Sequence, residues 1–376
     1  MLTRERPSHP AMSTADLVLD TRTKNASAVQ QQAIIGEHSN QWIFMIKKGD
    51  RTPRQIVQLK EVDGAELISL MDNSVDFLST IERKEVQQVR KWVKESKGED
   101  WIKEHFLLPV AEHGFSVLVR TFRSDGFHSI LFDAGGSYDG VVANANRMGL
   151  DLSEIESIVL SHGHYDHFGG LLAVLRVVNK AGLPIVVHED MSRTRGIAEP
   201  DGTVRKHRDF PTDDQVKPAR YVRTKQPHLL AGDTILVTGE IPRKMSFEKG
   251  FSQHRVFVDG KWEPDPHIWD DRAIVINIKQ KGLVVISGCA HSGIVNTALY
   301  AKQITAANDV FAIMGGFHLA GKEFEPRIVP TVKELKLLKP QLILPSHCTG
   351  WRGTYAIAQA MPDAFIWGSV GNLYRF

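Results

Sequence analysis

The sequence predicts an α/β sandwich, and two patterns support this prediction. Apolar segments of strand length alternate with segments of helix length in the β-α-β order typical of this class. The two halves of the chain also share one arrangement, in which a strand runs into a histidine-bearing turn and then into a helix. No repeat at a fixed short period accompanies this arrangement.

The composition is that of an ordinary globular protein. The 376 residues are 42% hydrophobic and 24% charged, which suits one large α/β domain or two smaller ones. The formal net charge is +2, so neither a nucleic acid nor a membrane surface is expected as a partner.

Cysteine is scarce and histidine is abundant, with two and 16 residues respectively. Two cysteines cannot build a disulfide framework, which indicates a reducing compartment. The N-terminus lacks the apolar segment of a signal peptide, and no run of about 18 apolar residues occurs. These features predict a cytoplasmic protein.

Residues 1–30 are polar and predict an N-terminal extension, followed by a single domain over 31–376. An early hairpin is expected within 41–60. Two insertions are expected, at about 81–108 and 190–270. The first has apolar residues at helical spacing and forms either a surface helical hairpin or a lid over the site. The second is polar, too long for a plain loop, and predicted to surround a site.

Strands are expected where short apolar runs end in glycine or polar residues, and helices where apolar residues recur at helical spacing. The first half predicts strands at 66–71, 115–122, 128–132, 155–160 and 184–187, with helices at 141–148 and 170–181. The polar 190–270 segment contains strand-like runs at 234–237 and 255–258. The last part predicts strands at 273–278, 283–286, 310–314 and 342–344, with helices at 295–306 and 328–338.

The residues with the clearest chemistry follow the 155–160 strand. His162, His164, Asp166 and His167 lie within six residues. Zinc and related ions bind neutral imidazole and carboxylate ligands that converge within about 2.0–2.2 Å. His162 and His164 alternate in an extended segment and can face one side, while Asp166 and His167 turn towards a second position. A metal site is therefore favoured over a solvated histidine-rich turn.

This His-x-His-x-Asp-His motif, with Asp133-Ala134-Gly135 upstream, resembles the metallo-β-lactamase superfamily over roughly residues 65–376. The resemblance implies an αββα sandwich with the metal site at one edge, between two sheets. It also implies a first metal site built on His162 and His164 and a second built on Asp166 and His167. Asp133 then orients the loop and is not a ligand.

Five further motifs, at 111–114, 238–243, 287–293, 315–319 and 345–350, narrow the resemblance. Together they are similar to the subgroup named for 7,8-dihydropterin-6-methyl-4-(β-D-ribofuranosyl)aminobenzene 5′-phosphate synthase. Hydrolases of the superfamily usually supply a third first-site histidine from the turn that matches 238–243, and this turn contains none. His291 is the first choice to replace it, and His347 matches the last expected ligand. Cys289 stands where a bridging aspartate is usual, as a ligand or as a neighbour of the ligands.

The sequence leaves the roles of several other candidate residues open. His318 is a ligand, a substrate contact or a structural residue, and Glu240 and Arg243 are possible ligands or substrate contacts. Arg220 joins Arg243 as a candidate for binding an anion. Glu112 and His113 are expected beside the ligands. His188 is more consistent with a buried structural histidine.

The leading functional hypothesis is a metal-dependent hydrolase that uses an activated water on an ester, lactone, amide or phosphoester. Asp166 is the candidate to accept a proton from that water. One alternative is a transferase or synthase acting on a pterin-like or phosphorylated substrate, and another is a non-catalytic binding module. The expected cofactor is one or two zinc ions per chain, with iron or manganese also possible. The expected partner is a small molecule, anionic or aromatic, and the oligomeric state is left open.

Overall fold

The computed structural model describes residues 56–376, which belong to one compact unit. The predicted extension at 1–30, the predicted start of the domain at residue 31 and most of the predicted hairpin at 41–60 lie outside the described residues. No helix within the described part is long and apolar enough to cross a membrane.

Two sheets form the centre of the fold. The first has eight strands in the order β10-β7-β6-β5-β4-β2-β19-β3, and the second has seven, in the order β11-β12-β15-β16-β17-β18 with β1 beside β15. The strands of the first sheet are β2 (Gly64–Met71), β3 (Val86–Gln87), β4 (Ser116–Arg123), β5 (Gly126–Phe132), β6 (Ser157–Val159), β7 (Pro184–Val187), β10 (Arg220–Arg223) and β19 (Leu373–Arg375). Those of the second are β1 (Glu61–Val62), β11 (His228–Leu230), β12 (Ile235–Val237), β15 (Ala273–Ile278), β16 (Gly282–Ser287), β17 (Val310–Gly316) and β18 (Leu342–Ser346).

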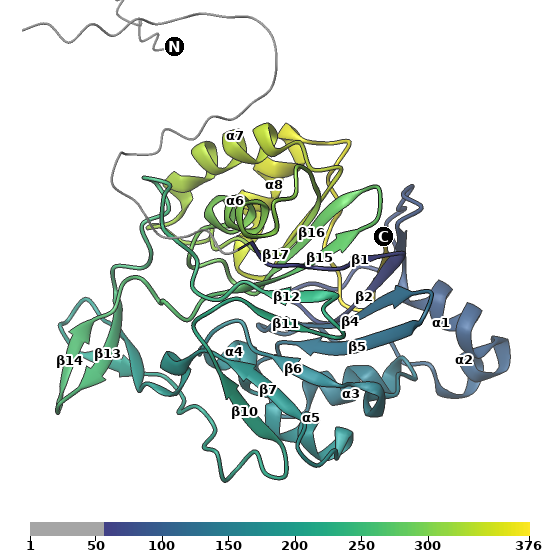
Figure 1. Cartoon of the computed structure of the whole chain (residues 1–376), viewed down its shortest axis with the longest axis horizontal. Helices are drawn as coiled ribbons and strands as arrows, with labels where there is room; N and C mark the ends of the chain where they lie inside the picture. The colour runs from purple at the N-terminus through teal and green to yellow at the C-terminus, as the bar shows by residue number, and fades with distance from the viewer. Residues whose placement is uncertain (1–55) are drawn as a thin grey trace, which may run out of the picture. The chain divides into compact units, whose positions relative to one another are not determined.

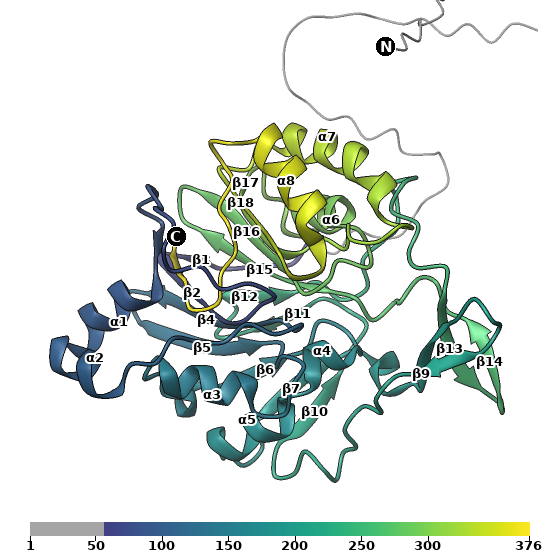
Figure 2. The ribbon, with the colours of Figure 1, turned by 180° about the vertical axis from the view of Figure 1, so that it is seen from behind.

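Helices cover the outer face of each sheet, which gives the four layers αββα (Figures 1 and 2). The helices against the first sheet include α1 (Val89–Lys97), α3 (Gly140–Arg147) and α5 (Leu171–Val178). Those against the second are α6 (Ile294–Thr305), α7 (Ile328–Leu338) and α8 (Gly350–Ala360). The predicted fold class is confirmed.

Apolar residues fill both sides of each sheet. In β4, Val117 and Val119 pack between the two sheets, whereas Leu118 packs towards the helices. In β16, Ile286 faces the other sheet and Val285 faces the helical layer. Because both faces are buried, the sequences of these strands are continuous apolar runs and do not alternate between apolar and polar residues.

The elements predicted from residue 66 to residue 344 are all present, with ends that shift by at most three residues. Two elements near the C-terminus were not predicted, α8 and β19. The three residues of β19 pair with β2 on one side and with β3 on the other. A segment this short has too weak a local pattern to be identified as a strand without its partners.

The two expected insertions differ in their outcome. Residues 81–108 contain α1 and α2 (Glu99–His105), and Trp92 of α1 is buried and donates a hydrogen bond to the carbonyl oxygen of Gly371. This packing fits the surface helical hairpin. The 190–270 segment is not one continuous excursion, because β10, β11 and β12 within it belong to the two main sheets. The rest supplies a third sheet, ordered β14-β13-β8-β9, from β8 (Arg195–Ala198), β9 (Val204–Lys206), β13 (His254–Val258) and β14 (Lys261–Pro264).

Parallel pairing brings the functional loops together. β5, β6 and β7 run parallel in the first sheet, and β16, β17 and β18 run parallel in the second. Their carboxyl ends therefore lie at one edge of each sheet, the edge where α/β proteins place their sites. Four non-glycine residues just beyond these ends have positive φ, namely Asp133 (61°), Ala290 (53°), His318 (46°) and His347 (49°). Such strain is typical of functional turns.

The layer between the two sheets should dominate stability. We expect Ile276→Ala, which truncates a fully buried side chain in that layer, to lower the free energy of unfolding by about 2–5 kcal/mol. Val329→Ala is the matched control, because Val329 on α7 is 78% exposed and its truncation should cost less than about 0.5 kcal/mol. Urea unfolding followed by fluorescence measures both. Equal losses in the two variants would contradict the assigned core.

Candidate metal centre

The histidine motif occupies the loop that leaves β6 and the first turn of α4 (Tyr165–Phe168). His162 is fully buried at the end of this strand, and His164 immediately precedes α4. Asp166 and His167 lie in the helix itself and are buried. The motif therefore presents four donor side chains from one short segment.

One set of donors, here named the Asp166 group, consists of Asp166, His167, Cys289 and His347. The Oδ2 atom of Asp166 lies 3.3 Å from Nε2 of His347 and 3.6 Å from Nε2 of His167. Nε2 of His167 lies 3.2 Å from Sγ of Cys289. All four donor atoms lie within 4.8 Å of one another, and all four residues are buried.

A second set, here named the His162 group, consists of His162, His164 and His291. Nε2 of His162 lies 2.9 Å from Nδ1 of His164 and 3.2 Å from Nε2 of His291. Nitrogen ligands that share one zinc ion lie about 3.3 Å apart, given bonds of about 2.0–2.1 Å and tetrahedral angles. The three ring nitrogens have the spacing of a shared cation.

Asp133 determines which ring nitrogens are available in both groups. Its carboxylate accepts hydrogen bonds from the hydroxyl of Ser161 and from Nδ1 of His167, each at 2.7 Å. Because the Ser161 proton is used in this way, the Ser161 oxygen accepts from Nδ1 of His162 at 3.0 Å. The Nε2 atoms of His162 and His167, which these hydrogen bonds leave unused, then point into the donor groups.

His347 is oriented in the same manner by a different partner. Its Nδ1 donates to the amide oxygen of Asn73 at 2.9 Å, so its Nε2 carries a lone pair. That Nε2 is buried, has no hydrogen-bond partner among the described residues, and faces the Asp166 carboxylate. Two acceptors that face each other in a buried site repel unless a cation or a proton lies between them. This arrangement fits a bound metal ion.

Burial sets the protonation of the donors. It lowers the pKa values of His162, His164 and His291 well below their ordinary value, so these imidazoles are neutral, as metal ligands must be. Burial acts to raise the pKa of Asp166, but the surrounding histidines, His167 first, hold it well below its usual range. Burial also acts to lower the pKa of His167, but Asp133 and Asp166 raise it to about 9. For Cys289, burial raises the thiol pKa well above its ordinary value.

Comparison with known proteins identifies the family. Residues 110–295 match the family model described as the metallo-beta-lactamase superfamily. The chain is 30% identical over 280 residues to the 7,8-dihydropterin-6-methyl-4-(beta-D-ribofuranosyl)-aminobenzene-5'-phosphate synthase of Methanocaldococcus jannaschii, a match that covers 71% of this chain and 90% of that protein. The chain belongs to the metallo-β-lactamase superfamily. Members of this superfamily bind divalent metal ions, and the two donor groups supply residues suited to that role.

Two further similarities agree with this assignment. An uncharacterised protein of the same archaeon is 30% identical over 275 residues, which covers 70% of this chain and 93% of its own. The crystal structure of Tm1679, described as a metal-dependent hydrolase of the beta-lactamase superfamily, superposes with a TM-score of 0.61 at 23% identity, covering 83% of this chain and 98% of that one. The similarity to Tm1679 shows the fold alone.

Several predicted neighbours of the ligands lie beside them. Glu112 accepts hydrogen bonds from the backbone nitrogens of Gly136 and Ser137 at 3.1 and 2.9 Å. His113 is exposed, with Nε2 3.3 Å from Oδ2 of Asp166. The His318 ring centroid lies 4.2 Å from that of His291, and its Nδ1 is buried without a partner. His318 also forms a donor trio with Cys289 and His291, a trio that shares both of those residues with the groups above.

Glu240 and Arg243 lie outside the donor groups. Glu240 is hydrogen bonded to Nε2 of His188 at 3.1 Å, which makes His188 a structural histidine. The Arg243 guanidinium donates to the carbonyl oxygens of His267 and Ile268. Neither residue belongs to a donor group among the described residues, and their role as substrate contacts stays a prediction.

Sequence reasoning missed three residues that contact the predicted donors. Asn73 follows β2 and lies between His347 and His113, to whose Nδ1 atoms it is hydrogen bonded at 2.9 and 3.3 Å. His207 and His254 come from the third sheet and form a donor trio with His164. The high histidine content was the only signal for the last two, because no motif marks them.

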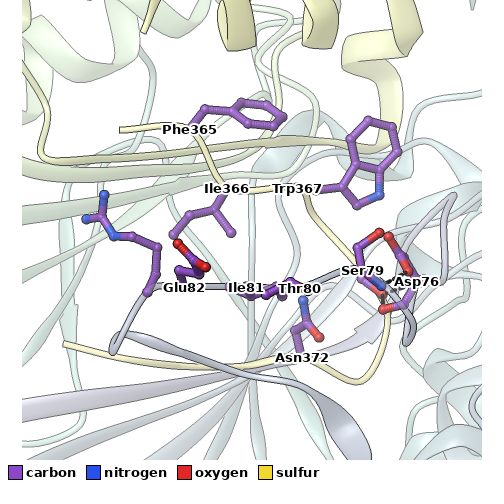
Figure 3. A pocket seen from close by; sticks show the side chains of 11 residues that line it. Asp76, Ser79, Thr80, Ile81, Glu82, Phe365, Ile366, Trp367 and Asn372 are labelled. Carbon is purple, nitrogen blue, oxygen red and sulfur yellow. Dashed lines mark hydrogen bonds between the residues drawn. The ribbon is translucent and has the colours of Figure 1, made fainter. Parts of the chain in front are cut away.

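A separate cavity of about 490 Å³ lies between residues 76–83 and residues 365–372 (Figure 3). Phe365 and Trp367 line one side of it and Asp76 lies on the other, and Arg83 also belongs to its lining. None of the donor residues lines this cavity. The Arg83 guanidinium is paired with Glu85 and with backbone carbonyls, so the charge of this arginine is already engaged.

Filling the Asp166 group should release protons, because the metal competes with them. At pH 7 the elevated pKa values keep His167 protonated and Cys289 a thiol. We expect wild-type zinc uptake to release about one proton more per chain than uptake by Cys289→Ser, since serine keeps its proton. Zinc affinity at this group should therefore rise with pH through about 9, where His167 loses its proton, and should keep rising above it, because the thiol pKa of Cys289 is raised well above its ordinary value. Calorimetry in buffers of different ionisation enthalpy measures the release, and equal release from both proteins would exclude a Cys289 thiolate ligand.

Proposed function

We propose that this chain is a metal-dependent hydrolase acting on an anionic ester, lactone, amide or phosphoester. The observation that carries the proposal is the pair of adjoining donor groups, in which the Nδ1 atoms of His162, His167 and His347 are bound to the protein and their Nε2 atoms point inward. His162, His164 and His291 would hold one ion, and Asp166, His167, Cys289 and His347 a second. A set of nitrogen, sulfur and carboxylate donors favours zinc over magnesium or calcium, and iron or manganese are the alternatives.

A divalent ion at these donors supplies Lewis-acid chemistry, since it makes hydroxide available near neutral pH and polarises a carbonyl or phosphoryl oxygen. The protein residues hold the donors in place and keep them in their ligand forms. The low pKa of Asp166 makes its carboxylate a weak proton acceptor, so its role is that of a ligand more than of a general base. His207 is neutral at pH 7 because burial lowers its pKa to about 4, and its Nδ1 has no hydrogen-bond partner.

Arg208 is the arginine that we assign to an anionic substrate, in place of Arg220 and Arg243. Its guanidinium lies 5.2 Å from the ring centroid of Tyr165, which precedes Asp166, and 3.5 Å from the carbonyl oxygen of Gly136. Among the described residues it has no carboxylate partner. An exposed arginine of this kind can bind a phosphate or carboxylate in bidentate fashion.

Removing a donor should remove both metal and activity. We expect His162→Ala to lose the ion of the His162 group and to lower kcat/KM by about a hundredfold or more, because the Lewis acid provides several kcal/mol of transition-state stabilisation. His105→Ala, on the exposed side of α2, is the control and should match the wild type. Elemental analysis measures the metal content, and a screen of esters, lactones and phosphoesters measures the activity. Undiminished turnover in His162→Ala would refute the hydrolase proposal.

Arg208 should affect only substrates that carry a negative charge. We expect Arg208→Ala to lower kcat/KM roughly tenfold for an anionic substrate, as loss of one charged hydrogen bond predicts, and to leave a neutral analogue unchanged. Arg205→Ala is the matched control, since Arg205 lies in β9 and is paired with Glu199 at 2.8 Å. Equal effects of Arg208→Ala on both substrates would place the anion elsewhere.

A second candidate is a metal-dependent transferase or synthase that acts on a pterin-like or phosphorylated substrate. The 30% identity to a protein named as a synthase favours it. Reaction in ¹⁸O-labelled water separates the two candidates, because a hydrolysis product takes up the label and a synthase product contains both substrates.

A chain that retains no metal after purification without chelator would favour a non-catalytic binding module.

A further inference from the structure

The third sheet places two histidines, His207 and His254, beside His164. His254 begins β13, and its Nε2 lies 3.0 Å from Nε2 of His164. His207 follows β9, and its ring centroid lies 5.1 Å from that of His164. His254 is fully buried and His164 partly buried. This side of His164 faces away from the His162 group, which His164 joins through its Nδ1 atom.

The partners of His254 determine where the protons lie. Nδ1 of His254 lies 2.9 Å from the backbone carbonyl oxygen of Asp265. A carbonyl oxygen only accepts, so this Nδ1 carries the proton and Nε2 of the neutral ring becomes an acceptor. Nε2 of His164 must then donate to it. The remaining lone pair of His164, on Nδ1, is directed at the His162 group, 2.9 Å from Nε2 of His162.

His254 is itself held by pairing and by buried charge. It pairs with Ile197 across the β8–β13 ladder, and its carbonyl oxygen accepts from the Asp265 backbone nitrogen at 3.0 Å. Arg195, also in β8, makes a bidentate ion pair with Asp270, with both nitrogen–oxygen distances at 2.6 Å. Asp270 in turn accepts from the backbone nitrogen of Gly163, between the two motif histidines, at 2.8 Å. The third sheet therefore supports both the backbone and a side chain of the motif.

We propose that His254 is a positioning residue that fixes the tautomer and orientation of His164 and thereby sets the metal affinity of the His162 group. The inference rests on the proposed function, because it assumes that this group binds a metal ion. Partners that accept from the second nitrogen of a ligating histidine orient its ring and increase its basicity. Their removal typically weakens metal binding about 10–100-fold.

A third cation held by His164, His207 and His254 is the competing interpretation, since their donor atoms also lie within 4.8 Å of one another. It would require His164 to provide both ring nitrogens as ligands and to give up the one ring proton that its neutral imidazole carries. The hydrogen-bonded chain from His164 through His254 to Asp265 satisfies every nitrogen of the two rings without that cost. The geometry therefore favours a positioning role.

The test compares His254→Phe, which keeps a ring but removes the acceptor, with His254→Gln, which restores an acceptor near the position of Nε2. His207→Phe is the matched control on the same side of His164. Zinc dissociation constants are measured by chelator competition, without reference to turnover. In the cobalt-substituted proteins, the thiolate-to-cobalt absorption of Cys289 reports separately on the Asp166 group.

We expect His254→Phe to weaken the binding of one of the two ions about 10–100-fold. The cobalt–thiolate absorption should stay unchanged. His254→Gln should recover most of the affinity, and His207→Phe should bind both ions as the wild type does. Unchanged affinity in His254→Phe, an equal loss at both groups, or no recovery in His254→Gln would overturn the inference while the proposed function stands. A third wild-type ion that is lost in both Phe variants would establish the competing cation site. A wild-type chain that binds no metal would refute the proposed function itself.

Discussion

The buried carboxylate of Asp133 is the constraint on which the rest of the centre depends. It follows β5 with a positive φ and accepts from the Ser161 backbone nitrogen, the Ser161 hydroxyl and Nδ1 of His167, each at 2.7 Å. One charge thus fixes the end of β6 and the ring orientations of two histidines. The carboxylate and Ser161 also leave no room for a side chain at residue 288. A Cβ on Gly288 would lie 2.7 Å from Oδ2 of Asp133 and 2.2 Å from Oγ of Ser161. Glycine at this position lets the loop of the second sheet approach closely enough to deliver Cys289.

Each donor group combines the two halves of the chain. His162 and His164 come from the first sheet and meet His291 from the second, and Asp166 and His167 meet Cys289 and His347 in the same way. Neither half alone completes the His162 group or the Asp166 group, so each of these two groups exists only when the two sheets pack together. The apolar layer between the sheets therefore determines the geometry of the centre, and metal binding is coupled to folding.

The departure from the usual superfamily pattern has a structural explanation. The turn at 238–243, which usually supplies a histidine, instead supports neighbouring loops through Glu240 and Arg243. His291 reaches the place of the absent ligand because it lies only two residues beyond Cys289, on the same strand-end turn, where Ala290 has positive φ. The third sheet adds His207 and His254 on the outer side of His164. We therefore propose that His291 takes the place of the donor that the 238–243 turn lacks.

The αββα layering was implied by the resemblance to a known superfamily, whereas the α/β class, the order of the main strands and helices, and the main candidate donors could be predicted from the residues themselves. Those features are local, since apolar periodicity and a six-residue motif are readable within one segment. The three-residue β19, the third sheet and the contacts of Asn73, His207 and His254 were decided only by the tertiary structure. Their positions depend on pairing between residues far apart in the chain, as with Leu373 and Ile68 or His254 and Ile197. Long-range pairing of this kind leaves no periodic trace in a single sequence, because its stabilisation comes from the partner strand and not from the segment itself.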